Sequence, residues 1–187
     1  MRKLAGIAAM TLIGLLAIAG TARAGKQNEK KAPATQTMPA GKATATIEAR
    51  SGSSLSGTAE FVMHDDKLMI TVSLKGAPPG PHAVHIHEKG DCSAPDASSA
   101  GAHFNPGGHQ HGSPDAPEHH AGDLGNIVIG EDGTGSLMVH SGELGLAGGP
   151  NSVLGRALIV HEKSDDFVTQ PTGNAGGRIG CGVINAS

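Results

Sequence analysis

The segment Leu68-Met69-Ile70-Thr71-Val72-Ser73-Leu74 alternates between branched aliphatic side chains and a second, more varied set. In an extended chain, such alternation puts leucine, isoleucine and valine on one face and methionine, threonine and serine on the other. This pattern is typical of a half-buried β-strand. The turn formers Gly76-Ala77-Pro78-Pro79-Gly80 end the pattern. The segment therefore predicts a strand whose aliphatic face lies in a core.

Short apolar runs bounded by turn formers recur on both sides of this segment and predict seven further strands. The chain contains 29 glycines and 11 prolines, no tryptophan and no tyrosine, and it shows no convincing helical periodicity. This combination favours an all-β domain. The further strands are expected at residues 43–50, 55–63, 82–88, 125–130, 135–140, 155–161 and 178–184.

The N-terminus carries the features of a secretory signal peptide at residues 1–24. Met1-Arg2-Lys3 is basic, residues 4–19 are almost entirely apolar, and Ala22-Arg23-Ala24 matches an A-x-A cleavage site. A membrane anchor is the alternative, but a spanning helix needs about 20 apolar residues and this run is shorter. We expect cleavage after Ala24, no stable membrane insertion afterwards, and export, most simply to a bacterial periplasm.

The exported chain is expected to be one acidic domain behind a short leader. Cleavage would remove three basic residues and no acidic one from the 14 and 17 of the whole chain, so the net charge would change from −3 to −6. Such a charge without a basic cluster argues against nucleic acid as a partner. Residues 25–42 have almost no large apolar side chain and are expected to be disordered, which leaves residues 43–187 as the folded domain.

Two long segments, residues 89–124 and 162–177, interrupt the predicted strands. Loops longer than about 12 to 15 residues in a compact domain are usually functional or disordered. Cys92 lies near the start of the first loop and Cys181 lies in the last predicted strand. An even pair of cysteines in an exported chain favours a disulfide that ties this loop to the strands, with two buried free thiols as the alternative.

The histidines predict metal binding. His85 and His87 lie two residues apart on one face of a predicted strand, a spacing at which two imidazoles can reach one ion. Six potential ligands follow in the first loop: His103, His109, His111, His119, His120 and Asp123. Imidazole with an added carboxylate suits zinc, whose closed sites need four ligands. A flexible histidine-rich tract is the alternative for the loop, and a core position is the alternative for His161, which ends the apolar run 157–160.

Five segments resemble the copper/zinc superoxide dismutase family, in order and with matching spacing, over roughly residues 43–185. They are VHIHEKGDCS (84–93), AGAHFNPGGHQHG (100–112), HHAGDLGNI (119–127), GRALIVHEKSDD (155–166) and GNAGGRIGCGVI (173–184). The family fold is a flattened, eight-stranded Greek-key β-barrel, an immunoglobulin-like sandwich, in which the two long segments would be functional loops. The family reaction converts superoxide to dioxygen and hydrogen peroxide by alternate reduction and reoxidation of copper.

Carried over residue by residue, the resemblance implies one copper and one zinc ion per subunit. The copper ligands would be His85, His87, His103 and His161, and the zinc ligands would be His103, His111, His120 and Asp123. His103 would bridge both metals and take up a proton at its copper-facing nitrogen. The remaining histidines would lie at the surface or behind the ligands: His64, His82, His109, His119 and His140.

The resemblance also assigns roles to Arg178 and Asp165. Arg178 matches an arginine that guides the superoxide anion to copper, and Asp165 matches an aspartate that links a copper-bound histidine to a zinc-bound one, here His85 and His111. The loop 162–177 holds one lysine against three acids. We therefore expect guidance to fall on Arg178 and Lys163, with help from lysines such as Lys67, Lys75 or Lys89.

Two other classes of protein are weighed against this enzyme. A periplasmic copper- and zinc-binding or delivery module could use the same barrel, but all four implied copper ligands are present. A structural or adhesive export domain would be indifferent to chelation, whereas metal that binds only the folded state stabilises it. Because the family contains monomers and dimers, a homodimer is left open.

Overall fold

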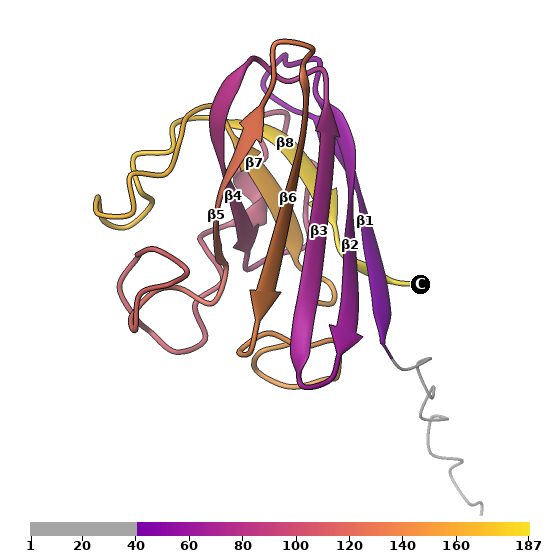
Figure 1. The fold of residues 1–187 in the computed structure, drawn as a ribbon, viewed down its shortest axis with the longest axis vertical. Helices are drawn as coiled ribbons and strands as arrows, with labels where there is room; N and C mark the ends of the chain where they lie inside the picture. The colour runs from indigo at the N-terminus through magenta and orange to yellow at the C-terminus, as the bar shows by residue number, and fades with distance from the viewer. Residues whose placement is uncertain (1–40) are drawn as a thin grey trace, which may run out of the picture. The chain divides into compact units, whose positions relative to one another are not determined.

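Two layers of antiparallel strands face each other across an apolar core in the computed structural model, which describes residues 41–187 (Figure 1). The signal peptide expected at 1–24 and nearly all of the leader expected at 25–42 lie outside the described residues. The strands are β1 (Lys42–Ala49), β2 (Ser56–His64), β3 (Lys67–Lys75), β4 (Gly80–His87), β5 (Asp123–Ile129), β6 (Thr134–Ser141), β7 (Ala157–His161), β8 (Arg178–Val183) and β9 (Asn185–Ala186).

The all-β prediction is confirmed. Eight of these strands coincide with the eight predicted ones, and β9 adds two residues that pair with β1. Within residues 41–187, the one helical element is a single turn of 3-10 helix, Ser98–Ala100, in the first long loop. No helix in this range is long and apolar enough to cross a membrane.

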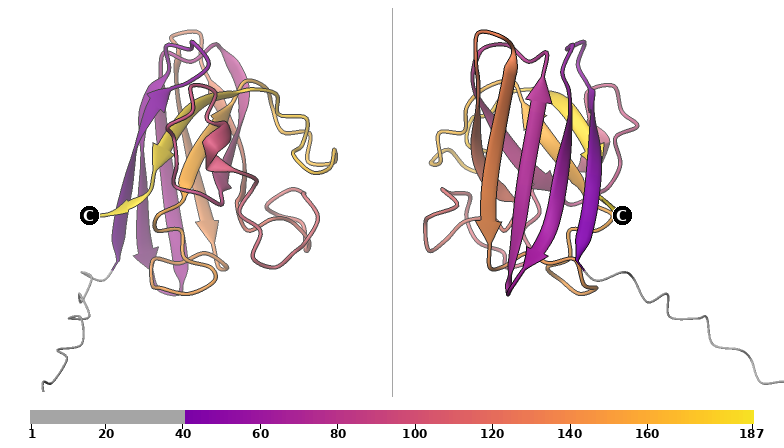
Figure 2. Two further views of the ribbon diagram at one scale, coloured as in Figure 1. Left: turned by 180° about the vertical axis from the view of Figure 1, so that it is seen from behind. Right: turned by 45° about the vertical axis from the view of Figure 1, so that its right-hand side comes forward.

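The strands follow one another around the molecule in the order β5-β4-β7-β8-β1-β2-β3-β6. Strands β1, β2, β3 and β6 form one layer, and β4, β5, β7 and β8 form the other (Figure 2). The chain passes from the first layer to the second after β3 and again after β6, while β1 pairs with both β2 and β8. This arrangement is the predicted flattened, eight-stranded Greek-key barrel.

The barrel comes close to closure where β5 and β6 lie side by side. A tight turn joins them, in which the backbone N–H of Gly133 donates to the carbonyl of Gly130. A Cβ atom at Gly135 would lie 2.5 Å from the carbonyl oxygen of Val128. Glycine is therefore required at residue 135 for the two backbones to approach each other.

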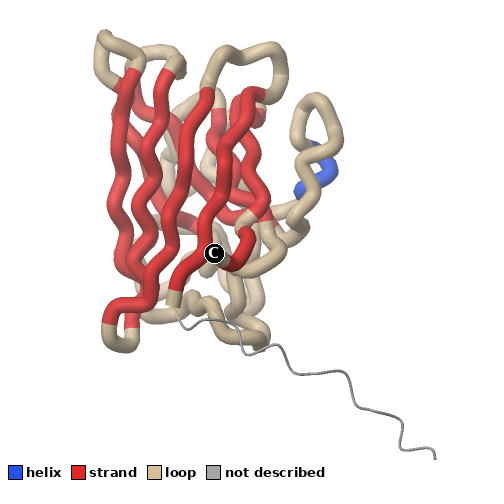
Figure 3. The backbone as a smooth tube through the Cα atoms, turned by 90° about the vertical axis from the view of Figure 1, so that its right-hand side faces the viewer, coloured by secondary structure: helices blue, strands red, loops and turns tan. Residues whose placement is uncertain are grey.

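The core follows the alternation seen in the sequence. Leu68, Ile70 and Val72 of β3 are fully buried in the space between the layers. In β4, Val84 and Ile86 point into the same core, whereas the alternate residues His85 and His87 point to the opposite face. That opposite face is buried as well, because the long loops cover it. Figure 1 shows parts of both loops projecting at the left of the barrel, and Figure 3 shows the segment with the helical turn standing out from the strands.

Candidate metal centre

Four buried histidines from three parts of the chain converge on the outer face of β4. They are His85 and His87 of β4, His161 at the end of β7, and His103 of the first long loop. One ring nitrogen from each lies within 4.8 Å of the others. The structure thus brings together all four histidines that the resemblance assigns to copper.

Each of these rings has one nitrogen with no hydrogen-bond partner. The unpartnered buried atoms are Nδ1 of His85 and Nε2 of His87, His103 and His161. A buried polar atom without a partner is costly, and native structures contain few of them. Four such lone-pair donors directed at one point fit a bound transition-metal ion, for which imidazole is a preferred ligand.

The other nitrogen of each ring is held by the protein. Nε2 of His85 lies 2.7 Å from Oδ2 of Asp165, and Nδ1 of His103 lies 2.9 Å from Oδ1 of Asp123. Nδ1 of His87 and Nδ1 of His161 face the carbonyl oxygens of Gly101 and Gly176, at 2.9 and 3.4 Å. These contacts fix which nitrogen is free to bind a metal and hold each ring in orientation.

Irregularities in strand pairing lie next to two of these histidines, His85 and His161. The register between β4 and β5 shifts between Ala83 and His85, and the register between β7 and β8 shifts between Val160 and His161. Bulges of this kind redirect a side chain at a functional site. His103 is held differently, because the N–H of the neighbouring Phe104 donates to the carbonyl of Ile86 in β4 and the carbonyl of Phe104 accepts from the N–H of Gly122.

A second set of ligand atoms shares His103 with the first. Geometry groups His85, His103, His111 and Asp123 within 4.8 Å. His85 has no nitrogen left for a second ion, because Nε2 is bonded to Asp165 and Nδ1 belongs to the first set. Nδ1 of His120 lies 3.3 Å from Nδ1 of His103 and 3.4 Å from Oδ1 of Asp123. His120 therefore completes a second set of three imidazoles and one carboxylate, a donor set that suits zinc.

Asp123 is the acceptor at the middle of the second set. Its Oδ2 lies 3.0 Å from the unpartnered Nδ1 of His111 and also accepts hydrogen bonds from the backbone N–H groups of His120 and Gly112. Burial by itself would raise the pKa of Asp123, but the contacts with His103 and His111 hold it well below its usual range. The carboxylate is therefore ionised at every pH at which the protein works.

Asp165 joins the two sets of ligands from behind. Its Oδ2 bonds to Nε2 of His85, and its Oδ1 lies 2.8 Å from Nε2 of His111. The contact between Asp165 and His111 depends on a glycine at residue 173. A Cβ atom there would lie 2.6 Å from Nε2 of His111 and would overlap the Asp165 carboxylate. Gly173 also has a φ of +66°, which favours glycine.

Burial and charge give the rings opposite affinities for protons. Burial lowers the pKa of His85 to about 4 and the pKa values of His87 and His161 to about 2. Burial also acts to lower the pKa of His111, but the carboxylates of Asp123 and Asp165 outweigh it and raise this pKa to about 9. His85, His87 and His161 are thus neutral lone-pair donors, whereas the carboxylates around His111 make a negative environment that favours a cation.

Arg178 lies beside the first set, at the start of β8. Its Nη1 donates to the carbonyl of Ala97 and its Nη2 donates to the carbonyl of Gly101, both at 2.7 Å. Gly101 is also the acceptor for His87, so one carbonyl orients both side chains. The arginine is half-buried, and these two hydrogen bonds hold its positive charge in a fixed position near His87.

Comparison with known proteins identifies the family. The family model for copper/zinc superoxide dismutase matches residues 55–184. A relative from Brassica juncea, superoxide dismutase (Cu-Zn) 2, is 40% identical over 151 residues, which cover 77% of this chain and 97% of the relative. The chain belongs to the copper/zinc superoxide dismutase family. It is also similar to a solved structure titled as the clock protein EA4, with a TM-score of 0.72 and 36% identity over 79% of this chain and 95% of that one.

The activity follows from family membership. This superoxide dismutase converts superoxide to dioxygen and hydrogen peroxide and uses copper and zinc as cofactors. The two sets of donor atoms match those two metals in chemistry, with imidazoles alone in the first and an added carboxylate in the second.

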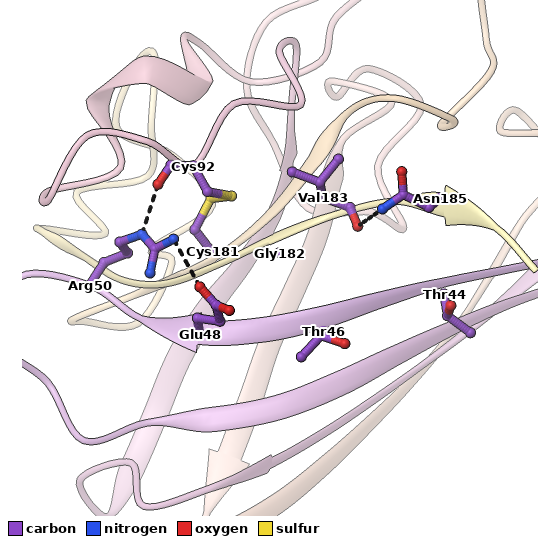
Figure 4. A pocket seen from close by; sticks show the side chains of 9 residues that line it. All are labelled: Thr44, Thr46, Glu48, Arg50, Cys92, Cys181, Gly182, Val183 and Asn185. Carbon is purple, nitrogen blue, oxygen red and sulfur yellow. Dashed lines mark hydrogen bonds and ion pairs between the residues drawn. A yellow bond between two sulfur atoms is a disulfide. The ribbon is translucent and has the colours of Figure 1, made fainter.

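The predicted disulfide is present in this superoxide dismutase. Cys92 of the first loop is bonded to Cys181 of β8 across 89 residues of chain. Arg50 supports it, because its Nε donates to the carbonyl of Cys92 at 3.0 Å and its Nη2 lies 3.3 Å from Glu48 (Figure 4). The segment that supplies the carbonyls of Ala97 and Gly101 to Arg178 is therefore anchored to β1 and β8.

The other five histidines lie outside both ligand sets. His64, His109 and His140 are exposed and His119 is half-buried. His82 is buried, with Nδ1 2.9 Å from the carbonyl oxygen of His161 and Nε2 2.9 Å from that of Pro78. His82 therefore supports the backbone of His161 from behind, one of the two places expected for the histidines that are not ligands.

Proposed function

We propose that the two ligand sets divide the metals of the dismutase as the resemblance implies. His85, His87, His103 and His161 hold copper, and His103, His111, His120 and Asp123 hold zinc. The observation that carries this proposal is the position of His103, whose Nε2 is unpartnered among the first set while its Nδ1 faces Asp123 and His120. One imidazole thus offers a nitrogen to each metal.

When bound, copper supplies the one-electron chemistry by which one superoxide is oxidised and a second is reduced. The protein's own part is to attract the anion and to deliver a proton. We assign attraction to the Arg178 guanidinium, which the two carbonyls hold in place. We assign proton uptake to Nε2 of His103, the nitrogen directed at the copper ligands. Asp165 acts as a positioning residue for His85 and His111.

The direct test measures superoxide dismutation by the purified mature protein, with copper and zinc quantified before and after selective removal of copper. Activity that follows copper occupancy and returns when copper is added supports the assignment. His161→Ala should lose copper and keep zinc, whereas Asp123→Ala should lose zinc first. Metal in both sites without activity would instead favour a copper- and zinc-binding or delivery module.

We also propose that the protein is exported, to the periplasm of a bacterium. The signal-like residues 1–24 and a disulfide, which persists in oxidising compartments, support this location. Mass spectrometry of protein from fractionated cells tests it, with a mature N-terminus at Gly25 as the expected result. Recovery of chains that still carry residues 1–24 in the cytoplasm would contradict it.

Two finer expectations belong to the same proposal. Lys163 should assist Arg178 in attracting superoxide. A salt dependence of the dismutation rate that is weaker in Lys163→Gln than in the wild type would support this role.

The protein could also form a homodimer. Light scattering would then give twice the mass of one mature chain, and the mass of a single mature chain would exclude the dimer.

A further inference from the structure

The part of the first long loop that leads to His111 is not held by strand pairing. Residues 105–111 belong to no strand. The backbone N–H of Gly108 donates to the carbonyl of Asn105, and the side chain of Asn105 bonds to both the N–H and the carbonyl of His109. All three hydrogen bonds stay inside the segment. They shape its turn but do not attach it to the barrel.

One side chain from the second long loop holds the backbone of His111. Oε1 of Gln170 accepts a hydrogen bond from the N–H of His111 at 2.9 Å, and Nε2 of Gln170 donates to the carbonyl of His111 at 2.8 Å. The amide thus offers His111 one acceptor and one donor, as a neighbouring strand would. Within residues 41–187, no other group bonds to these two backbone atoms.

The two hydrogen bonds satisfy groups that burial keeps from water. His111 is buried, although Gln170 itself lies at the surface. A buried N–H or carbonyl that loses its partner destabilises the structure around it, because the group has already lost its water. Removing the amide of Gln170 would therefore favour an opening of the loop at His111.

Gln170 is placed by its own loop, without any contact with a ligand atom. Oδ1 of Asp166 accepts hydrogen bonds from the N–H groups of Val168 and Thr169, and the carbonyl of Thr169 accepts one from the N–H of Gly173. Nε2 of Gln170 also lies 3.4 Å from the carbonyl oxygen of Val168. This turn fixes the direction in which the amide points.

The side chain of His111 is held by the same loop, through Asp165. Oδ1 of Asp165 lies 2.8 Å from Nε2 of His111. The backbone of Asp165 is held in turn by Asn126 of β5, whose Oδ1 accepts from its N–H at 2.7 Å and whose Nδ2 donates to its carbonyl at 3.0 Å. Asp165 therefore orients the ring of His111, and Gln170 places the backbone that carries the ring.

The contacts of Gln170 leave the ligand atom of His111 free, because they involve only its backbone, whereas Nδ1 has no hydrogen-bond partner. They can therefore form before a metal binds. Ordering a loop costs conformational entropy, and a segment that is already ordered binds its ligand more tightly.

We propose that Gln170 is a positioning residue for zinc binding. Its amide holds the backbone of His111 in the binding position in the metal-free protein and thereby increases the affinity for zinc. The proposal rests on the assignment of His111 to zinc, which is itself proposed above.

The first test compares Gln170→Met with Gln110→Met by competition with zinc and copper chelators. Methionine keeps the length of the side chain but lacks the amide. Gln110 is the matched control, because it is an exposed glutamine next to His111 whose side chain forms no hydrogen bond in the described part of the chain. Gln170→Met should lower zinc affinity about tenfold relative to the control.

Copper affinity, measured without zinc, should be the same in the two variants, because Gln170 contacts none of the four histidines of the first set. Equal zinc affinity in Gln170→Met and Gln110→Met would overturn the proposal. An equal loss of zinc and copper affinity in Gln170→Met would overturn it as well, because that result indicates general damage to the fold.

The second test measures hydrogen exchange at single backbone N–H groups of the metal-free protein by NMR. The N–H of His111 should exchange several-fold faster in Gln170→Met than in Gln110→Met. The N–H of Phe104, which donates to Ile86, should exchange at the same rate in both. An unchanged rate at His111 would show that the amide does not hold this backbone.

His111→Ala separates this proposal from the ligand assignment. Zinc affinity that is unchanged in His111→Ala would contradict the assignment, and the role of Gln170 would be lost with it. Loss of zinc in His111→Ala together with equal zinc affinity in the two glutamine variants would overturn the role of Gln170 alone.

Discussion

Nε2 of His85 and Oδ2 of Asp165 lie 2.7 Å apart, and neither side chain is exposed to solvent. The second carboxylate oxygen of Asp165 lies 2.8 Å from Nε2 of His111, so one buried charge orients an imidazole of each ligand set. Such a contact fixes the nitrogen that faces the ion and increases the basicity of the ring.

We expect Asp165→Asn to weaken zinc binding about 10 to 100-fold, because an amide has one acceptor oxygen in place of two and adds a donor that faces an imidazole. Competition with a zinc chelator measures the change. Asp166→Asn is the matched control, since Asp166 is exposed and its Oδ1 accepts backbone hydrogen bonds that an amide oxygen can keep. Equal zinc affinity in both variants would contradict the role of Asp165.

Gly173→Ala should lower zinc affinity and thermal stability, because the added methyl group would overlap the Asp165 carboxylate and crowd His111. Gly108→Ala separates this contact from backbone strain. Gly108 has nearly the same φ, +69° against +66°, but an added Cβ would meet nothing within 4 Å. Calorimetric unfolding of the zinc-loaded proteins should therefore show a larger loss for Gly173→Ala, and equal losses would place the whole effect in the backbone.

Arg178→Ala should lower kcat/KM for superoxide about tenfold or more and should weaken its dependence on ionic strength, because a fixed positive charge near His87 is lost. Arg178→Lys keeps the charge but offers a single nitrogen, which cannot reproduce the two hydrogen bonds to Ala97 and Gly101. We expect an intermediate rate with normal salt dependence. Pulse radiolysis at several salt concentrations measures both, and an unchanged rate in Arg178→Ala would refute the assignment.

The double variant Cys92→Ser/Cys181→Ser should lose stability and activity together. Opening a covalent loop of 89 residues lowers the free energy of unfolding by up to about 4 to 5 kcal/mol in the chain-entropy model. Activity per bound copper should fall as well, because the released segment carries the carbonyls that hold Arg178. Urea unfolding and dismutation assays at equal copper content check both, and full activity per copper would show that Arg178 is held without the disulfide.

The metal-free protein should lose stability as the pH falls below about 6.5. The pKa values of His85, His87 and His161 are lower in the folded state, about 4, 2 and 2, than the value of about 6.5 in an unfolded chain. The unfolded state therefore binds more protons in this range. For each pH unit below about 6.5, each of these histidines lowers the free energy of unfolding by about 1.4 kcal/mol until its folded-state pKa is reached.

His111 affects stability in the opposite direction, because its pKa of about 9 in the folded state exceeds its unfolded value. Its contribution to the free energy of unfolding is fully present below pH 6.5 and is lost as the pH rises through 9. Urea unfolding of metal-free protein at pH 5, 7 and 9 measures both effects. Equal stability at pH 5 and pH 7 would mean that the three buried rings accept protons without unfolding.

The sequence alone was sufficient for the strands. The alternation at Leu68, Ile70 and Val72 predicted which side chains enter the core, because a strand places every second side chain on the same face whatever its partners are. The same period separated Val84 and Ile86 from His85 and His87. The order in which the strands pair was not contained in that pattern and came from the resemblance, since pairing joins residues far apart in the chain.

For the metal centre, the sequence by itself determined the candidate ligands, eight histidines and one aspartate in three segments. The resemblance chose among them. The tertiary structure decided which nitrogen of each ring is free, because that depends on partners such as Gly101 and Asp165 that lie 14 and 80 residues away from the rings they hold. It alone decided that His82 is buried, with Nδ1 against the carbonyl oxygen of His161. The periodicity of the sequence indicates on which face of a strand a side chain lies. The groups that the side chain contacts there depend on how distant parts of the chain pack.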